Sequence, residues 1–261
     1  MSITIKLPTV ELVNHVLMPM VRMGGECQLI FDGGVLYSIC STSTSSRSQV
    51  VMLAECVATA NTTDRIEMNI GNPKKYVDIL KNIPDATVSL IYDGASLFYS
   101  NPSSDALVRE FRFVLLSDPP SAIYSRETIN GIVYNTSASL SLDNLRRIYQ
   151  LSSTSSIPNK MYVETSGKAL RCTLTDRSYD GADSIAFTLA EAYSGSQISN
   201  VIISSDVLPY VVGCLDSGSE CGISFSNNKI VTFDIKNYAG EGDTRRLVSH
   251  IMYLTPTRVE R

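Results

Sequence analysis

The side chains that most often carry out catalysis or bind metals are few in this sequence and lie far apart. The only histidines are His15 and His250, and neither has further metal ligands at the spacing of a zinc site. A Ser-His-Asp arrangement would have to be built around one of these two residues. The sequence contains no GxSxG elbow, no Walker-type phosphate loop and no GxGxxG motif. The nearest glycine cluster, Gly240–Asp243, lies between predicted strands and is typical of a hairpin connection.

The cysteines and carboxylates do not suggest a catalytic site either. The six cysteines lack CxxC spacing and fall in apolar segments, which favours buried reduced thiols over disulfides or zinc ligands. The carboxylates occur singly or in turns, and none are paired for acid–base chemistry. We therefore predict a binding or scaffold protein rather than an enzyme, with no cofactor and no metal. The cysteines are Cys27, Cys40, Cys56, Cys172, Cys214 and Cys221.

The composition further limits the classes of protein to which this chain can belong. With 261 residues and 44% hydrophobic residues, the chain can bury a large core and is not disordered as a whole. No apolar stretch approaches the roughly 18 residues of a membrane-spanning helix, and the N-terminus lacks a signal-peptide profile, so we expect a soluble intracellular protein with no membrane partner. The net charge of −4 makes the distribution of lysine and arginine more informative than their sum.

A repeated unit organises the chain. Helix-start signals recur near Thr9, Asn72, Ser141 and Ser205, at separations of about 63, 69 and 64 residues, and short alternating strands follow each. The segment 118–130, with Pro119 and Pro120, interrupts the pattern. We predict an α+β fold made of two similar domains with antiparallel sheets and two helices each, in which residues 1–117 and 131–261 are the domains and 118–130 is the connector.

The first two predicted helices are amphipathic. The first, Val10–Arg22, places Val13, Val16, Leu17 and Met20 on one face and Glu11, Asn14, His15, Met18 and Arg22 on the other. In the second, Asn72 can cap the helix, Pro73 suits its first position and Pro84 lies beyond its end. Its apolar stripe is Tyr76, Val77, Leu80 and Ile83, and its opposite face carries Lys74, Lys75, Asp78 and Lys81.

The third predicted helix starts at a Ser141 cap and is also basic on its outer face. It turns Leu142, Leu145, Ile148 and Tyr149 inward and Asp143, Arg146, Arg147 and Gln150 outward. The fourth, Val207–Cys214, contains Pro209 and has no lysine or arginine. On any single helix these cations could form an ordinary solvated face. If the repeated units face the same way, however, the cations line one surface, which in an acidic protein indicates contact with nucleic-acid backbone.

The whole chain resembles the ring-shaped DNA sliding clamps of the proliferating-cell-nuclear-antigen type and of T-even-like phages. The segment His250–Pro256 is similar to the terminal strand and Tyr-Leu-Ala-Pro turn of the eukaryotic and archaeal clamps. Ser117–Ser121 and Leu140–Leu145 look more like the phage clamps. The resemblance favours a viral or phage source without deciding the branch, and it implies a DNA-clamp fold in which sheets lie outside and helices line the inner face.

The resemblance also implies a function and its residues. The chain would be a DNA polymerase processivity factor, a head-to-tail homotrimer around double-stranded DNA that partners polymerase and clamp loader. DNA-facing residues would be Arg22, Lys74, Lys75, Lys81, Arg146 and Arg147. Subunits would pair through the edge strands Leu107–Leu116 and Asp183–Ala190, with interface residues Arg109, Phe111, Phe113, Ile185, Phe187 and Leu189. Sealing an exposed edge strand in this way removes an aggregation hazard.

The resemblance further implies a hydrophobic groove for partner peptides, although several of its positions could instead be core residues. The matching positions are Ile39, Ile123, Tyr124, Ile230, Tyr253, Leu254 and Pro256. Such a clamp would act in the host cytoplasm if it belongs to a phage, or in a replication compartment otherwise. The first helix offers mainly Arg22 and the fourth no cation, so the channel would be less positive than is usual for the family.

Three alternatives remain open at this point. A monomeric viral processivity factor would use the same domain plan but hold DNA by charge, and the acidic composition argues against it. A non-catalytic assembly protein could keep the plan for oligomerisation only. A hydrolase or sugar-modifying enzyme on a β-rich scaffold would need a polar pocket with perturbed titratable groups, which the sequence does not reveal.

Overall fold

The computed structural model describes residues 2–24, 27–44, 48–101, 108–118, 124–153, 160–177, 183–240 and 242–259. The chain divides into two compact units. Unit 1 comprises Met1–Ser41, Met52–Arg126 and Tyr238–Ile251, and unit 2 comprises Thr42–Val51, Glu127–Asn237 and Met252–Arg261. The domain limits assigned from the sequence stay a prediction.

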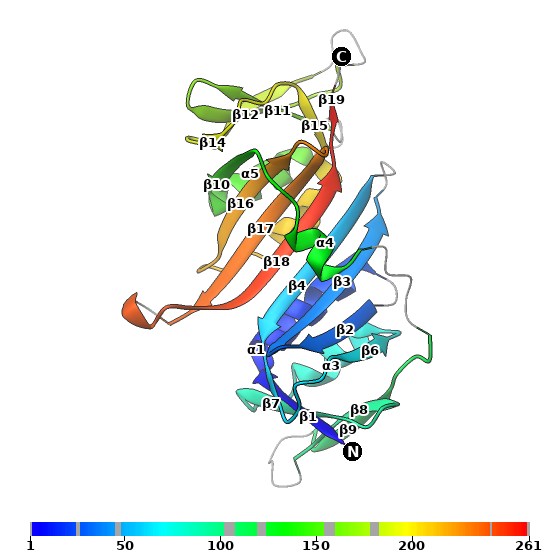
Figure 1. Cartoon of the computed structure of the whole chain (residues 1–261). Helices are drawn as coiled ribbons and strands as arrows, with labels where there is room; N and C mark the ends of the chain where they lie inside the picture. Colours follow the sequence, from blue (N-terminus) through cyan, green and yellow to red (C-terminus); the bar gives the residue numbers. More distant parts are fainter. Residues whose placement is uncertain are drawn as a thin grey trace. The chain divides into compact units, whose positions relative to one another are not determined.

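The chain runs through four copies of one pattern, in which a strand leads into a helix and then into further antiparallel strands (Figure 1). The first copy is β1 (Ile3–Pro8), a helix of α1 (Thr9–Glu11), η1 (Leu12–Leu17) and α2 (Met18–Met23), then β2 (Cys27–Asp32), β3 (Val35–Ser43) and β4 (Gln49–Val57). The second is β6 (Ile66–Ile70), α3 (Pro73–Leu80), β7 (Thr87–Tyr92), β8 (Ser96–Ser100) and β9 (Glu110–Val114). The third is β10 (Thr136–Leu140), α5 (Leu142–Ser152), β11 (Lys160–Ser166), β12 (Ala169–Leu174) and β13 (Ile185–Ala190). The fourth is β15 (Val201–Ser204), η2 (Ser205–Val207) with α6 (Leu208–Val212), β16 (Glu220–Ser226), β17 (Ile230–Ala239) and β18 (Arg246–Pro256).

A few short elements lie outside this pattern. They are β5 (Thr59–Ala60), α4 (Arg126–Asn130), β14 (Ser194–Gly195), η3 (Gly242–Thr244) and β19 (Arg258–Val259). The helix α4 was not expected, because the prolines of the connector predict irregular structure there. The glycine cluster at 240–243 lies between β17 and β18, where the sequence predicts a connection.

Unit 1 is built on two antiparallel runs of strands. One sheet has the order β5-β1-β7-β8-β9, which leaves β9 at an edge. In the other, β4, β3, β2 and β6 are successive neighbours. The hairpin of β2 and β3 pairs Asp32 with Val35 across Gly33 and Gly34, whose φ angles are 57° and 85°. Only residues that tolerate positive φ can form such a two-residue turn, and glycine does so without strain.

Unit 2 repeats this plan. One sheet has the order β13-β12-β11-β15-β19, so β13 is an edge strand. In the other run, β14, β10, β16 and β17 are successive neighbours. Strand β16 alternates between buried Cys221, Ile223 and Phe225 and less buried residues, the pattern of a sheet with one covered face. The predicted α+β class with antiparallel sheets is thereby confirmed.

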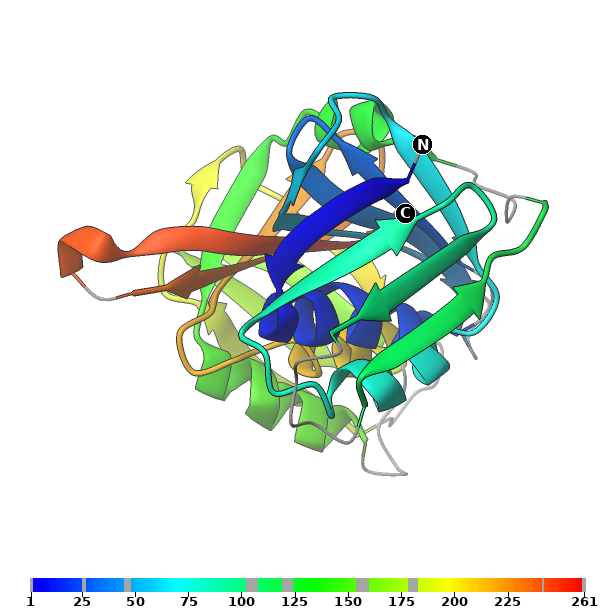
Figure 2. The ribbon, with the colours of Figure 1, turned by 90° about the horizontal axis from the view of Figure 1, so that it is seen from below.

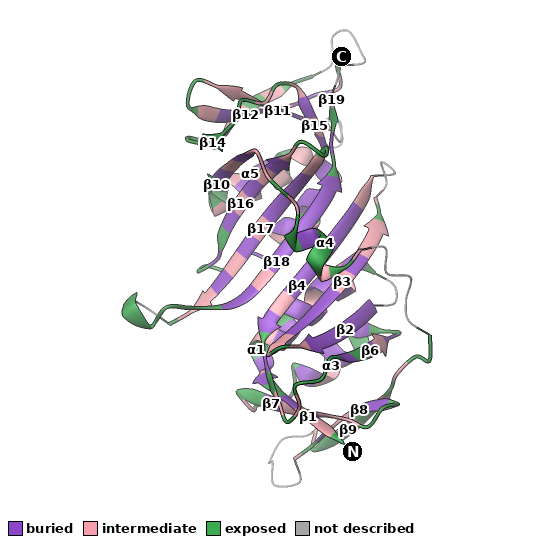
Figure 3. Cartoon of the chain, in the orientation of Figure 1, coloured by how far each residue is buried: buried purple, intermediate pink, exposed green. Residues whose placement is uncertain are grey.

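Apolar side chains fill the core of each unit, and buried positions dominate β2 and β4 in Figure 3. In unit 1 the helix of residues 9–23 contacts α3, and Figure 2 shows these two helices next to each other. In unit 2, α5 contacts α6 in the same way. Each unit therefore contains one pair of packed helices beside its sheets. Within the described part of the chain, no helix has the length and apolar character to cross a membrane.

The sequence signals at α3 and α5 predict their starts well. Pro73 stands in the first turn of α3, and Tyr76, Val77 and Leu80 are buried as expected. Ser141 caps α5 by accepting a hydrogen bond from the Asn144 backbone N–H at 3.4 Å. Asn72 occupies the N-cap position of α3, as the sequence predicts, but its side chain makes no capping hydrogen bond.

The outer face predicted for the first helix is partly wrong. His15 is only 6% exposed and lies in the core with Val16 and Leu17. From Leu12 to Leu17 the helix has the wider turns of a π-helix, so positions counted at 3.6 residues per turn shift around the axis. Pro19, which follows, lacks an N–H and would collide with the carbonyl four residues earlier in a regular α-helix.

Candidate nucleic-acid interface and partner surfaces

The exposed face of α3 carries the three predicted lysines. Lys74 and Lys75 occupy its first turn, and Lys81 is its C-terminal capping residue; all three are exposed. Lys81 Nζ lies 2.9 Å from Asp78 Oδ1, and this hydrogen bond is the main reason why the pKa of Asp78 is lowered. The charge of Lys81 is therefore partly balanced within the helix itself.

The position of Lys74 and Lys75 is unfavourable with respect to the dipole of α3. The N-terminal end of a helix carries a partial positive charge, so cations in the first turn are unfavourable there, by roughly 0.3–1 kcal/mol each. The first turn of α3 contains no acidic residue to compensate. Lys74 and Lys75 are thus two adjacent exposed cations at the positive end of the helix.

The other predicted DNA-facing cations are more sheltered. Arg22 lies in the last turn of α2, where a cation is favourable, and is half-buried. On α5, Arg147 is exposed, whereas Arg146 is half-buried with Nη1 3.5 Å from Asp143 Oδ1. The sequence of α6, LPYVV, has no cation. The structure thus places Arg22 on the helix that contacts α3 in unit 1, and Arg146 and Arg147 on the helix that contacts α6 in unit 2.

The first predicted interface strand is shorter than expected, running over Glu110–Val114 rather than Leu107–Leu116. Leu107 lies outside the described residues. Phe113 stacks on Tyr76 of α3 with ring centroids 3.8 Å apart, and Phe111 stacks on Tyr99 at 5.5 Å. Both phenylalanines therefore face the body of unit 1, while the preceding Arg109 is exposed.

The second predicted interface strand, β13, begins at Ile185 instead of Asp183. Ile185 and Phe187 are half-buried and Leu189 is 5% exposed. One side of β13 pairs with β12, including Phe187 opposite Cys172, and its other side is the sheet edge. Each unit thus carries one candidate strand at an edge, β9 in unit 1 and β13 in unit 2.

The seven predicted groove residues differ in accessibility. Ile39, Tyr124 and Ile230 are half-buried, Pro256 is exposed, and Ile123 lies outside the described residues. Tyr253 and Leu254, by contrast, are 0% and 6% exposed. The Tyr253 hydroxyl lies 3.1 Å from Cys214 Sγ and its ring contacts that of Tyr210, so this side chain is part of the core of unit 2.

Sequence reasoning missed a charged cluster in unit 1. Glu55 on β4 is paired with Arg126, whose Nε lies 2.5 Å from Oε1, and with His250, whose Nδ1 lies 3.8 Å from Oε2. Burial would raise the pKa of Glu55, but hydrogen bonds and charge from His250 and Arg126 outweigh it and lower the pKa. Arg126 also lies over the Tyr37 ring at 5.1 Å. The sequence does contain one signal for this cluster, which is the charged Glu55 within the otherwise apolar run QVVMLAECV of β4.

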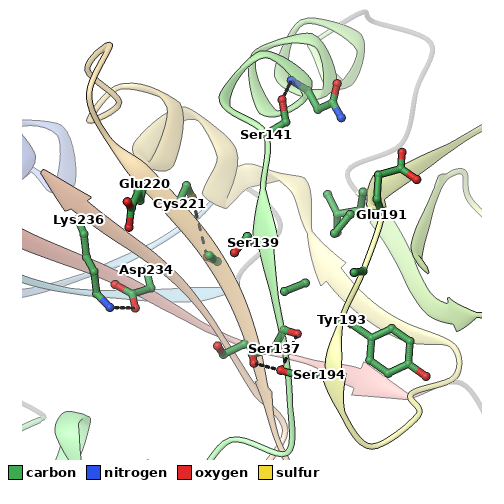
Figure 4. Close-up of a pocket in the computed structure, with 17 residues that line it drawn as sticks. Ser137, Ser139, Ser141, Glu191, Tyr193, Ser194, Glu220, Cys221, Asp234 and Lys236 are labelled. Carbon is green, nitrogen blue, oxygen red and sulfur yellow. Dashed lines mark hydrogen bonds and ion pairs between the residues drawn. The ribbon is translucent and has the colours of Figure 1, made fainter. Parts of the chain in front are cut away.

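A pocket of about 800 Å³ lies in unit 2, lined by residues of β10, α5, β13, β14, β16 and β17 (Figure 4). Its groups include Ser137, whose Oγ lies 2.8 Å from Ser194 Oγ, and Asp234, whose carboxylate lies 3.7 Å from Lys236 Nζ. The one cysteine in the lining is Cys221, and burial raises its pKa to about 12. Neither of the two histidines lines the pocket.

The geometry described above is that of the DNA-clamp fold. Among solved structures, the chain is similar to PCNA from A. fulgidus in its complex with the C-terminal region of FEN-1. The two share 17% sequence identity with a TM-score of 0.72, and the match covers 99% of each chain. At this identity the similarity establishes the fold.

Comparisons at the level of sequence give no match. No protein-family model matches the chain, and no curated protein does so. The fold is therefore shared over 99% of the chain without a detectable match at the level of sequence.

Proposed function

We propose that this chain is a sliding clamp, a DNA polymerase processivity factor that forms a ring, a homotrimer, around duplex DNA. The observation that carries the proposal is the pair of exposed lysines, Lys74 and Lys75, in the first turn of α3 within a clamp fold. These cations oppose the helix dipole, so their position is explained by an anionic partner. Arg147 on α5 gives unit 2 an exposed cation of the same kind.

The contact with DNA would be with phosphates and not with bases. Lysine and arginine side chains provide charge without sequence readout, and no aromatic side chain is interleaved with them on α3's outer face. A ring that encloses DNA gains from contacts that are weak and mobile, because tight contacts to bases would stop it sliding. The net charge of −4 fits attachment by enclosure better than attachment by charge alone.

Ring closure would join β9 of one subunit to β13 of the next. Both are edge strands, and an unpaired edge strand readily forms a ladder with another chain. Because the two edges belong to different units of one chain, their pairing is head-to-tail, and a closed ring results if the rotation permits. We expect Ile185→Asp/Phe187→Asp to convert the oligomer to a monomer. Val133→Asp, which changes an exposed apolar residue outside both edges, should leave the mass unchanged.

Partner binding is the third part of the proposal. The matched archaeal protein binds the C-terminal region of FEN-1, and by analogy this chain would bind short peptides of polymerase, clamp loader and other replication proteins. Of the groove residues, Ile39, Tyr124, Ile230 and Pro256 keep accessible surface for such contacts. Tyr253 and Leu254 would support the groove from within the core. The source we infer is viral or phage, acting where that DNA is replicated.

The decisive experiment combines solution mass by light scattering with retention on circular DNA. We expect a mass of three subunits across a dilution series and retention that is lost when the circle is linearised. Lys74→Glu/Lys75→Glu should weaken retention, whereas Lys168→Glu/Lys229→Glu, at exposed strand turns, should not. A persistent monomer with salt-sensitive binding would favour the charge-held processivity factor. No association with DNA, with or without a loader, would leave an assembly protein.

A further inference from the structure

The turn between β2 and β3 fixes which residues of the two strands face each other. Asp32 pairs with Val35 across the Gly33–Gly34 turn, and the register continues without a shift to Gln28 opposite Ile39. Since a two-residue turn with positive φ at both positions admits one register, the hairpin cannot slip without losing this turn. Extended by one position, this register sets Cys27 opposite Cys40.

These two cysteines contact each other through their side chains. A hydrogen bond joins the thiols of Cys27 and Cys40, and Ser38 Oγ lies 3.4 Å from Cys40 Sγ. The cysteines are 1% and 6% exposed, so both are held in packed surroundings. Directly opposed residues of an antiparallel pair have Cβ atoms about 4.5–5.5 Å apart. A disulfide needs about 3.5–4.5 Å, so only a small approach is required.

The two thiols are not equivalent. Hydrogen bonding by Cys27 and by Ser38 favours the thiolate of Cys40 against the effect of burial, and the pKa of Cys40 is lowered. The same contact with Cys40, together with burial, raises the pKa of Cys27. Because Ser38 Oγ contacts Cys40 Sγ and can stabilise its thiolate, we assign Cys40 as the nucleophile of the pair and Cys27 as its resolving thiol.

The other cysteines lack this arrangement. Burial raises the pKa of Cys56 and of Cys221 to about 12, and it also raises that of Cys172. Cys214 contacts the Tyr253 hydroxyl instead. All six cysteines are buried, and what sets Cys27 and Cys40 apart is the contact between their thiols.

We propose that Cys27 and Cys40 form a redox-active dithiol that a hydroperoxide oxidises to a reversible cross-strand disulfide. The Cys40 thiolate attacks one peroxide oxygen, the O–O bond breaks, and the leaving oxygen takes a proton, which leaves Cys40 as a sulfenic acid. The Cys27 sulfur then attacks the Cys40 sulfur, the S–O bond breaks, and the departing hydroxide takes the Cys27 proton as water. Two thiols are oxidised and one peroxide is reduced. This proposal does not depend on the clamp function.

The test is thiol mapping of the folded wild-type protein after hydrogen peroxide treatment. Remaining thiols are alkylated in denaturant, and the protein is digested without reductant. We expect a peptide pair joined through Cys27 and Cys40, a fall in free thiols from six to four, and full reversal by dithiothreitol. The other four cysteines are the internal control and should stay alkylated. If Cys27 and Cys40 stay alkylated too, or if crosslinks form equally among other cysteines, the proposal is wrong.

Single variants test the assigned roles. In Cys27→Ser the sulfenic acid at Cys40 has no resolving thiol, so dimedone should label Cys40 after peroxide treatment. In Cys40→Ser the remaining Cys27 should take up no dimedone. Labelling of Cys27 at the rate of Cys40 would overturn the assignment. Circular dichroism confirms that each variant is folded, and the wild-type mapping decides the main point even if one is not.

Discussion

Phe113 of β9 stacks on Tyr76 of α3, with ring centroids 3.8 Å apart and ring planes inclined by 21°. One contact therefore links the edge strand proposed to join subunits with the helix proposed to face DNA. Phe111 extends the aromatic row at 4.8 Å from Phe113. Since β9 has a strand neighbour on one side only, side-chain packing of this kind must hold much of its position.

Phe113→Ala should lower the free energy of unfolding by about 2 kcal/mol, less than for a fully buried phenylalanine because Phe113 is half-buried. It should also shift the oligomer toward monomer at low concentration, because a loosened β9 pairs less well. Chemical denaturation and light scattering measure the two effects. Val114→Ala is the control on the same strand, since Val114 is 78% exposed. Equal effects of both substitutions would contradict the role given to the stacked pair.

The elements that the sequence predicts best are those with start and stop signals in their own residues. Pro73 and Pro84 bound α3, and Ser141 bounds α5, so both helices could be placed from their own residues. The burial of His15 could not, because it follows from the wider turns of η1, which a regular 3.6-residue period does not describe.

The same distinction applies to the residues of the candidate site. Those placed by local geometry could be predicted, and those placed by contacts between distant segments could not. The lysines of α3 are exposed because helix geometry alone sets their face. The burial of Tyr253 depends on Cys214 and Tyr210, which are distant in sequence, so no local pattern shows it. The pairing of Glu55 with Arg126 and His250 likewise depends on segments that only the folded chain brings together.

Gly195 and Gly167 allow steric overlap to be separated from backbone strain. Both have positive φ, 96° and 61°, but a Cβ at Gly195 would overlap the Asn135 carbonyl oxygen, whereas one at Gly167 would meet nothing within 4 Å. Gly167→Ala should cost about 1 kcal/mol, the cost of the backbone conformation alone. Gly195→Ala should cost at least about 2 kcal/mol more and disturb the pairing of β14 with β10. Denaturant midpoints compare them, and similar losses would refute the overlap argument.

Glu55 should make stability depend on pH in the acid range. Its pKa is lowered in the folded chain, so the unfolded chain binds more protons where the two states differ. The stabilisation is complete above the unfolded pKa of about 4.3 and is lost as pH falls through the folded pKa. At pH 7, Glu55→Gln should destabilise the protein by about 1–2 kcal/mol.

The test compares urea unfolding of the wild type and Glu55→Gln between pH 7 and pH 3. The difference between them should persist down to about pH 5 and shrink below it. Glu191→Gln, a change at an exposed carboxylate, is the control and should stay close to the wild type throughout. A difference that grows below about pH 5 would contradict the paired state of Glu55.

Lys75 and Lys81 should contribute unequally to DNA binding although both are exposed lysines of the same helix. Lys81 Nζ is 2.9 Å from Asp78 Oδ1, so a phosphate must compete with a carboxylate for it. Each phosphate contact that is lost reduces the slope of log affinity against log salt by about 0.9. Lys75→Ala should approach that reduction, and Lys81→Ala should fall clearly short of it. Asp78→Asn should release Lys81 and steepen the slope. These slopes are measured by titrating duplex DNA at several salt concentrations, and identical slopes for Lys75→Ala and Lys81→Ala would exclude the competition that the ion pair implies.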